Sequence, residues 1–288
     1  MHYVTAKQIL SAGNGMNIYR GCQHGCIYCD ARSDCYRMDH AFTDIAVKEN
    51  AIGLLEQALK RKRRPCMLGT GSMSDPYMPL EESLGLTRKA LELAERYGFG
   101  MTLLTKSDRV LRDLDLLQRI NSKTKAVVQM TLTTMDERLC AIVEPEVCGT
   151  GRRIEVLGQL QEAGIPTVVW LCPILPFLND TQENIRGIVE SCAAVGVKGI
   201  IQFGMGLTLR EGNREYYFQK LDTHFPGLKE QYIRTYGLAY ELPSLREREL
   251  SRLFHKLCED HGIWHDNNTI FAYLRRFEEK EPEQLTLF

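Results

Sequence analysis

The sequence lacks an excess of charge of either sign and lacks any long apolar run. Its 288 residues contain 36 Lys and Arg against 37 Asp and Glu, which gives a net charge of −1. Without a general positive field, contact with nucleic acid has to come from local basic patches. Residues 61–64 and 275–276 are two such clusters, and solvated helix ends are an equally good interpretation of both. No segment approaches the ~18 apolar residues of a membrane-spanning helix, so we expect no membrane contact.

The amino-terminal residues, MHYVTAKQILSAG, lack the basic start and apolar core of a signal peptide. The ten cysteines then indicate reduced thiols or metal ligands, because disulfide frameworks belong mainly to oxidising compartments. With 44% hydrophobic residues, the chain is able to bury a full core. We therefore expect a cytoplasmic protein that consists of one large domain with an appendage.

Short apolar strands alternate with helical segments through most of the chain. Strands are predicted near 16–19, 65–70, 101–105, 126–132, 167–172 and 199–204, and helices at 47–61, 84–97, 109–120, 152–163 and 181–194. This alternation is typical of βα units around a parallel sheet. Six strands are two short of the eight in a closed barrel, so we predict an α/β fold with a partial TIM barrel, (β/α)6.

We assign this barrel to residues 1–205, with a polar loop at 20–44 that is too long to be a simple connection. Residues 206–288 have a different character, with aromatic and charged helical segments at 215–224, 228–236 and 244–261. They are predicted to form a helical C-terminal extension that packs across the barrel mouth.

Three cysteines stand close together in the 20–44 loop, at Cys22, Cys26 and Cys29, with the spacing C-x3-C-x2-C. This spacing differs from the C-x2-C pairs of structural zinc sites and from the ferredoxin pattern. Three thiolates can hold three irons of a [4Fe–4S] cluster and leave the fourth iron open to a small molecule. The alternatives are a zinc site that borrows Cys35 or His24, and three unrelated thiols.

A second polar loop, at residues 71–81, follows the second predicted strand. Its glycines allow close approach to the backbone, and its Ser and Asp side chains can bond an ammonium group. Because it lies one strand after the cysteine loop, we predict that Ser74 and Asp75 form the pocket wall for the amino-acid end of a cofactor. An ordinary turn leading into a helix cap is the alternative.

Further candidates lie at the ends of later strands. Thr133 follows the fourth strand, although threonine is common in strands for its β-propensity alone. Arg152 and Arg153 begin a helix and can pair with a carboxylate, whereas exposed arginines usually do nothing specific. Pro173 begins an apolar loop that either packs against an adenine ring or belongs to the core. Additional polar candidates are Lys106 and Gln129.

The last five residues of the sequence, QLTLF, follow a charged spacer. An apolar tail either folds back on the body of the protein or docks in a groove of another protein. This tail resembles the QLSLF-type pentapeptide by which bacterial DNA proteins bind the replicative sliding clamp. The resemblance implies that Gln284, Leu285, Leu287 and Phe288 contact the clamp.

Taken together, these motifs resemble those of the radical S-adenosylmethionine (radical SAM) enzymes, specifically the spore photoproduct lyase-like branch often labelled DNA repair photolyase. The resemblance covers about residues 15–205 and rests on YRGCQHGCIYCDAR, GSMSDPYMPLE, TLTTMDERLCAIVEP and AGIPTVVWLCPILPFLND. It implies a [4Fe–4S] cluster on Cys22, Cys26 and Cys29, with S-adenosylmethionine (SAM) at the open iron. It also implies reductive cleavage of SAM to methionine and a 5′-deoxyadenosyl radical, with an electron donor such as flavodoxin or ferredoxin.

Tyr28 stands before the third cysteine, where radical SAM enzymes carry an aromatic residue, and it is a candidate catalytic residue. Two positions depart from the lyase: Ser72 occupies the place of a hydrogen-donating cysteine, and Asp30 replaces a tyrosine. We therefore group Ser72 with the cofactor-binding candidates, and take Cys35 as a candidate hydrogen donor or a spare thiol. The resemblance supports the cofactor chemistry further than it supports the lyase's own substrate.

We expect a radical SAM enzyme that acts on DNA or another nucleic acid in a repair-like reaction. One alternative is a radical SAM enzyme that modifies a peptide, a protein or a small molecule. The other is a non-catalytic iron–sulfur protein that binds a partner or transfers electrons. Cleavage of SAM by the reduced protein separates the last alternative from the others, and salt-dependent DNA binding separates the first two.

Overall fold

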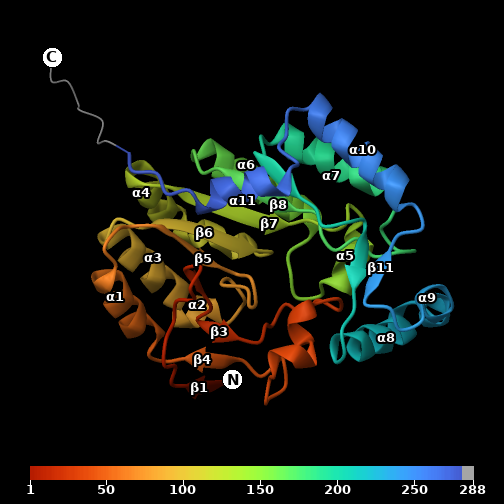
Figure 1. Ribbon diagram of the computed structural model, residues 1–288, viewed down its shortest axis with the longest axis horizontal. Coiled ribbons are helices and arrows are strands. Elements are labelled where there is room, and N and C mark those ends of the chain that lie inside the picture. The colour runs from red at the N-terminus through yellow and green to blue at the C-terminus, as the bar shows by residue number, and fades with distance from the viewer. Residues whose placement is uncertain (281–288) are drawn as a thin grey trace.

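The computed structural model of the protein describes residues 1–280. At its centre lies a parallel sheet of β2 (Gly15–Met16), β5 (Met67–Thr70), β6 (Gly100–Thr105), β7 (Ala126–Thr131), β8 (Thr167–Trp170) and β9 (Gly199–Ile201). The strands follow one another in the sheet in this order, and every neighbouring pair is parallel (Figure 1). The predicted α/β fold with a six-stranded partial barrel is confirmed.

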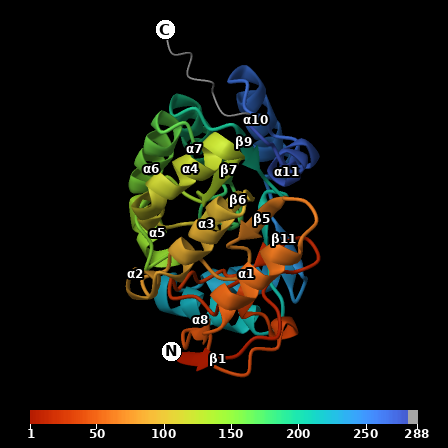
Figure 2. The same ribbon diagram turned by 90° about the vertical axis from the view of Figure 1, so that its left-hand side faces the viewer.

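Helices cover the outer face of this sheet, as the side view shows (Figure 2). They are α1 (Ala51–Arg61), α3 (Leu86–Arg96), α4 (Leu114–Lys123), α6 (Thr150–Glu162) and α7 (Gln182–Ala194). Every second strand residue, such as Leu103, Val128 and Val169, is buried with these helices in the main core. Because the strands are parallel, the loops after them all meet at one edge of the sheet, which we call the carboxyl edge.

The inner face of the sheet is covered by α11 (Asn267–Arg275), a helix that the sequence pattern did not predict. Val127, Val168 and Ile201 point to this face and pack against Ile270 and Leu274 of α11. The short helix is stabilised by this apolar contact, since nine residues are too few for a stable isolated helix.

Lys125, the residue before β7, holds the segment after α11 at the amino edge of the sheet, which is the edge opposite the carboxyl edge. The ammonium group of Lys125 donates to the carbonyl of Tyr273 (2.8 Å) and to that of Arg276, and it pairs with Glu278 (3.0 Å). Its side chain is only 1% exposed, so these contacts replace the water that a lysine normally keeps.

Several local elements differ from the expected boundaries. The predicted strand 16–19 is divided between β2 and β3 (Tyr19–Arg20), and β3 belongs to a small sheet with β4 (Ala46–Lys48) and β1 (His2–Val4). The predicted helix 84–97 is interrupted at Gly85, whose φ of +59° ends α2 (Glu81–Leu84) before α3 begins. A helix α5 (Glu137–Val143), which was not predicted, precedes α6.

The C-terminal part contains α8 (Asn213–His224), α9 (Leu228–Tyr236) and α10 (Glu247–Asp260), close to the predicted helices. It also contains an antiparallel pair that was not predicted, β10 (Gly206–Thr208) and β11 (Glu241–Pro243). α10 packs on α7 (Figure 1). The division of the chain at residue 205 stays a prediction, and the predicted clamp-binding residues Gln284, Leu285, Leu287 and Phe288 lie outside the described residues.

Within residues 1–280, no helix combines the length and the apolar character that a membrane crossing requires.

Candidate functional site

A cavity of about 540 Å³ opens at the carboxyl edge of the sheet. Its wall contains residues from the loops after β3, β5, β6, β8 and β9, and residues of β10 and β11. The sequence-predicted site residues in the wall are Cys22, Cys26, Tyr28, Cys29, Ser72, Ser74, Asp75 and Pro173. The fold therefore brings most of the predicted residues, from three separate loops, to one cavity.

The cysteine loop is held in place through its backbone. The N–H of Ile27 donates to the carbonyl of Val143 (3.0 Å), and the N–H of Glu146 donates to the carbonyl of His24 (3.2 Å). These two bonds lie on either side of Cys26 and join the loop to the end of α5 and the residues that follow it.

All three cysteines of the loop are free thiols. Burial and, to a smaller extent, the nearby Asp75 carboxylate raise the pKa of Cys22 to about 12. Burial also raises the pKa values of Cys26 and Cys29, against the opposing effect of the Lys106 ammonium. Thiols with raised pKa values are protonated at neutral pH, so metal binding at this loop displaces protons.

The loop after β5 forms the facing wall and fits closely against β6. Gly71 has a φ of +100°, and a Cβ atom there would lie 2.0 Å from the carbonyl oxygen of Leu104, so only glycine is accommodated. Asp75, in the middle of this loop, is buried and accepts hydrogen bonds from the Thr105 hydroxyl (2.7 Å) and the Lys106 N–H (2.8 Å).

Asp75 also faces His24 of the cysteine loop, with 3.3 Å between Oδ2 and Nδ1. Burial by itself raises the pKa of Asp75, but His24 and the hydrogen bonds from Thr105 and the Tyr77 N–H lower it to about 2. The hydroxyl of Ser74 donates to the carbonyl of Gly21 (2.5 Å). Both predicted residues thus join the two loops, and their contact with a cofactor ammonium group stays a prediction.

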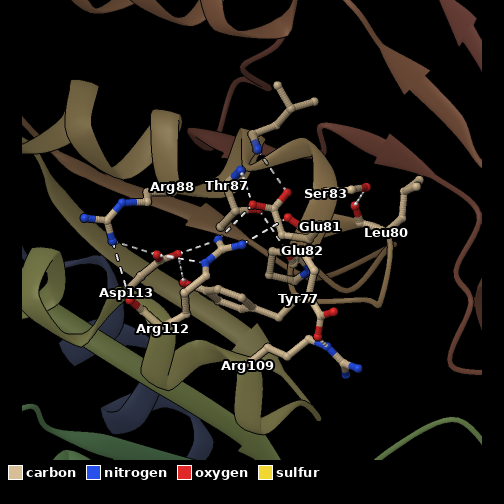
Figure 3. Close-up of polar contacts among 12 residues, drawn as sticks. Tyr77, Leu80, Glu81, Glu82, Ser83, Thr87, Arg88, Arg109, Arg112 and Asp113 are labelled. Carbon is tan, nitrogen blue, oxygen red and sulfur yellow. Dashed lines mark hydrogen bonds and ion pairs between the residues drawn. The ribbon is translucent and has the colours of Figure 1, made fainter.

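A polar network lies behind this wall (Figure 3). Glu81 accepts from the guanidinium of Arg112 (2.9 Å), which also pairs with Asp113 (2.8 Å). Asp113 accepts from the hydroxyl of Tyr77 (3.1 Å), and the N–H of Tyr77 donates to Asp75 (2.8 Å). The network therefore fixes the cavity wall through Tyr77.

A buried ion pair lies behind the cysteine loop and contacts it through Tyr28. Arg153 Nη2 lies 2.5 Å from Glu144 Oε2, and both side chains are 0% exposed. The other oxygen of Glu144 accepts from the hydroxyl of Tyr28, and Arg153 also donates to the Thr131 carbonyl at the end of β7 (2.8 Å). Burial raises the pKa of Tyr28, and Glu144 raises it further, so its hydroxyl keeps its proton.

Lys106 supplies a cation to the cavity. Its ammonium group makes no hydrogen bond or ion pair with any of residues 1–280, and it lies 5.9 Å from the centre of the Tyr28 ring. Burial by itself lowers the pKa of Lys106, but Cys26, Glu144 and Cys29 raise it overall. A charged ammonium without an acidic partner can bind a carboxylate.

The family model of the Radical SAM superfamily matches residues 16–192, from β2 to the end of α7. This span is more than half of the chain and includes the cysteine loop and the wall that faces it. The chain belongs to the radical SAM superfamily. Radical SAM proteins use a [4Fe–4S] cluster and SAM, so the predicted family and cofactors are confirmed.

Proteins with a similar sequence occur in distant organisms. An uncharacterized protein of Mycobacterium tuberculosis is 29% identical over 260 residues, which cover 85% of this chain and 75% of that protein. An uncharacterized protein of Methanocaldococcus jannaschii is 34% identical over 184 residues, 63% of this chain and 68% of that protein. The "Radical SAM Nalpha-GlyT isomerase" of Pseudomonas phage M6 is 25% identical over 180 residues, 62% of this chain and 36% of that protein.

The radical SAM fold of this chain is similar to solved structures of spore photoproduct lyase. One mutant of that enzyme matches with a TM-score of 0.67 and 17% identity over 92% of this chain and 80% of the other. The lyase complexed with dinucleoside spore photoproduct matches with a TM-score of 0.63 and 17% identity over 86% and 74%. At this level of identity the similarity establishes the fold.

The donor set of the cysteine loop fits a [4Fe–4S] cluster, because three thiols of one loop line the cavity and can each hold one iron. A zinc ion with Zn–S bonds of about 2.3 Å would hold its thiolates only ~3.8 Å apart. Among residues 1–280, the ligand atoms of His2, His40 and Asp44 form the one potential metal-binding group of three within 4.8 Å of one another, so at least one pair of the cysteine sulfurs is farther apart than this. His24 Nε2 is also buried without a partner in the described chain, as expected where a cofactor completes the wall.

Four predicted residues do not line the cavity: Cys35, Thr133, Arg152 and Arg153. Cys35 is exposed and contacts Arg210 (3.4 Å), and Arg152 makes ion pairs at the surface. Thr133 is buried and accepts hydrogen bonds through its carbonyl. Arg153 acts through Glu144 and Tyr28, as described above. Direct contact of these four with a cofactor or substrate stays a prediction.

Proposed function

We propose that this radical SAM protein is an enzyme that acts on DNA in a repair-like reaction. The observation that carries the enzymatic part is the convergence of three cluster-type cysteines and the unpaired Lys106 on one open cavity. The DNA part is supported by the fold shared with spore photoproduct lyase, whose structures include one with a dinucleoside photoproduct.

Different residues of the site have different roles in this proposal. Cys22, Cys26 and Cys29 would hold the cluster, and Lys106 would bind the carboxylate of SAM. When bound, this cofactor pair supplies one-electron cleavage of SAM. The Glu144–Arg153 pair keeps the cysteine loop in position, and the apolar wall around Pro173 excludes water from the reacting atoms.

The test uses the full chain, purified and reconstituted without oxygen. Iron and sulfide are counted, and 5′-deoxyadenosine is measured after addition of dithionite and SAM, with and without ultraviolet-irradiated DNA. We expect about four irons per chain, product formation, and a higher rate with the DNA. Zinc in place of iron, or a cluster that leaves SAM intact, would overturn the enzymatic role.

The Cys22→Ala, Cys26→Ala and Cys29→Ala variants serve as controls and are expected to form no 5′-deoxyadenosine. Product formation that is indifferent to DNA would contradict the DNA substrate and leave the radical chemistry standing. Replacing dithionite with flavodoxin or ferredoxin tests the proposed electron donors in the same assay.

A second candidate substrate is an amine-bearing peptide, protein or small molecule. The observation that favours it is the charge of the cavity mouth, where the carboxylates of Glu241 and Glu247 have no hydrogen-bond or ion-pair partner within residues 1–280. Carboxylates attract amines and repel phosphates. Stimulation of SAM cleavage by such a compound, with no effect of DNA, would favour this candidate.

We also propose that residues 284–288 bind the sliding clamp. Support comes from the position of Lys280, whose N–H donates to the carbonyl of Lys123 (2.9 Å) at the amino edge of the sheet. This edge is opposite the cavity, so a partner that docks there leaves the mouth open. Binding of the full chain to a bacterial clamp, and its loss on deletion of residues 284–288, are expected; equal binding after deletion would contradict the proposal.

A further inference from the structure

Three aromatic side chains form a continuous strip that starts at the cavity mouth. Trp170, at the end of β8, and Phe203, after β9, both line the cavity, with 5.7 Å between their ring centres. Phe203 stacks on Phe271 of α11, with 6.1 Å between the centres and 28° between the planes. One turn further along α11, the guanidinium of Arg275 lies 5.7 Å from the centre of the Phe271 ring.

Polar contacts hold Trp170 in a single orientation. Its indole N–H donates to the side-chain oxygen of Gln129 (2.8 Å), and the amide nitrogen of Gln129 donates to the hydroxyl of Thr102 (2.7 Å). The only polar atom of the indole is therefore satisfied by the protein. What Trp170 offers to the cavity is a rigid apolar surface.

Phe203 is 60% exposed, which is unusual for a phenylalanine at the wall of a cavity. The backbone beside it is held in place, because Asn267 bonds both the carbonyl (2.8 Å) and the N–H (3.3 Å) of the neighbouring Gln202. The ring itself contacts Trp170 and Phe271, and a flat ring that covers its exposed face would gain stacking energy.

The two ends of the strip carry opposite charge, so one end suits a base and the other end suits a phosphate group. Glu241 and Glu247 make the mouth itself unfavourable for phosphate groups. Arg275 is exposed at the other end of the strip and has no acidic partner in the described part of the chain. An unpaired nucleotide therefore fits with its base at the mouth and its backbone toward Arg275.

We propose that Trp170, Phe203, Phe271 and Arg275 form a binding site for single-stranded DNA, in which an unpaired base stacks on Phe203. The inference rests on the proposed function and specifies the form in which DNA reaches the cavity. Stacking on aromatic side chains tolerates any base, because each base has a flat π-face. The site thus selects unpaired DNA over duplex DNA and does not select a sequence.

The experiment measures the fluorescence anisotropy of a labelled single-stranded oligonucleotide bound to the reconstituted full chain, at several salt concentrations. Phe203→Ala is expected to weaken binding by roughly 10-fold or more, and Phe203→Tyr to retain it, because tyrosine keeps the ring. Arg275→Gln is expected to lower the slope of log K against log salt by about 0.7, the value for one phosphate contact with a single strand. Tyr3→Ala, which removes an exposed ring outside the strip, is the matched control and is expected to leave binding unchanged.

A second measurement does not depend on the Phe203 variants. The chain contains two tryptophans, so Trp264→Phe leaves Trp170 as the single reporter, and unlabelled single-stranded DNA is expected to quench its fluorescence. Equal affinity of wild type and Phe203→Ala, or tighter binding of duplex than of single strands, would overturn the site while leaving a DNA substrate intact. Failure of the wild type to bind any DNA would overturn the DNA part of the proposed function together with the site.

Discussion

Charged groups are paired at one end of the cavity and unpaired at the other. We call the first end the floor, which is the cysteine loop, the loop after β5 and the side chains directly behind them, and the other end, around Glu241 and Glu247, the mouth. On the floor, Glu144 pairs with Arg153, and Asp75 accepts four contacts from its own chain. At the mouth, Glu241 and Glu247 have no such partner within the described residues. A buried charge needs a partner, whereas a charge in water does not, so burial explains part of the difference.

The rest of the difference concerns function. The floor is completed by the chain itself except at Lys106 and His24 Nε2, which face the place where the cofactors bind. At the mouth, carboxylates and an exposed aromatic ring face water, as expected for a surface that binds a substrate. The floor residues therefore face the cofactors that the superfamily uses, and the mouth residues face solvent.

Removal of the Arg153 guanidinium, which pairs with Glu144, is expected to have the largest effect, and this effect is on stability. In Arg153→Met, Glu144 loses its partner in a fully buried position, and we expect the free energy of unfolding to fall by about 3–5 kcal/mol. Urea unfolding of the reconstituted protein measures the change. Arg152→Ala is the matched control: the Arg152 side chain is 40% exposed, and a change below about 1 kcal/mol is expected.

A double variant separates the ion pair from packing. Glu144→Gln together with Arg153→Met removes both charges, so it should be less destabilised than the sum of the single variants. Additive losses would show that the pair contributes nothing beyond the volume of its side chains.

Replacement of Lys106 is expected to have the next largest effect. Lys106→Gln removes the one ammonium among residues 1–280 that lines the cavity, and the affinity for SAM should fall by about 10- to 100-fold, as expected for a lost charge-assisted hydrogen bond. Equilibrium binding of SAM to the reconstituted variant is the measurement, with Lys106→Arg expected to retain part of the affinity. An unchanged affinity, at an unchanged iron content, would show that Lys106 does not contact the cofactor.

Substitution of the two carboxylates at the mouth is expected to have the smallest effect, and this effect is on DNA affinity. Glu241→Gln and Glu247→Gln should each strengthen single-stranded DNA binding by roughly 2-fold at low salt, because each removes one repulsion of the phosphates. The gain should disappear in high salt. If both variants instead weaken binding, the carboxylates accept hydrogen bonds from the substrate, and the contrast between floor and mouth needs a different explanation.

The sequence was sufficient to predict the sheet and the cysteine loop because both depend on local patterns. Apolar strands separated by helices specify parallel βα units, and the three cysteines lie within eight residues of one another. Convergence of the second loop on the same cavity also followed, since all parallel strands end at one edge.

Side-chain direction and long-range pairing could not be predicted in this way. Arg152 and Arg153 are neighbours with the same chemistry, yet one is at the surface and the other is the partner of Glu144. Lys106 was only one polar residue among several at strand ends. Helix α11 is short and weakly patterned, and its stability comes from contacts with strands that lie far away in the sequence.

The position of α11 has a consequence for biosynthesis. The inner core beneath the cavity closes only when residues 267–280 reach β7, β8 and β9, and these residues are synthesised after all six strands. A nascent chain that already contains the cysteine loop and all six strands therefore still exposes Val127, Val168 and Ile201 to water. Iron and sulfide delivered at that stage would meet an incomplete core, so we expect cluster insertion to follow the packing of α11.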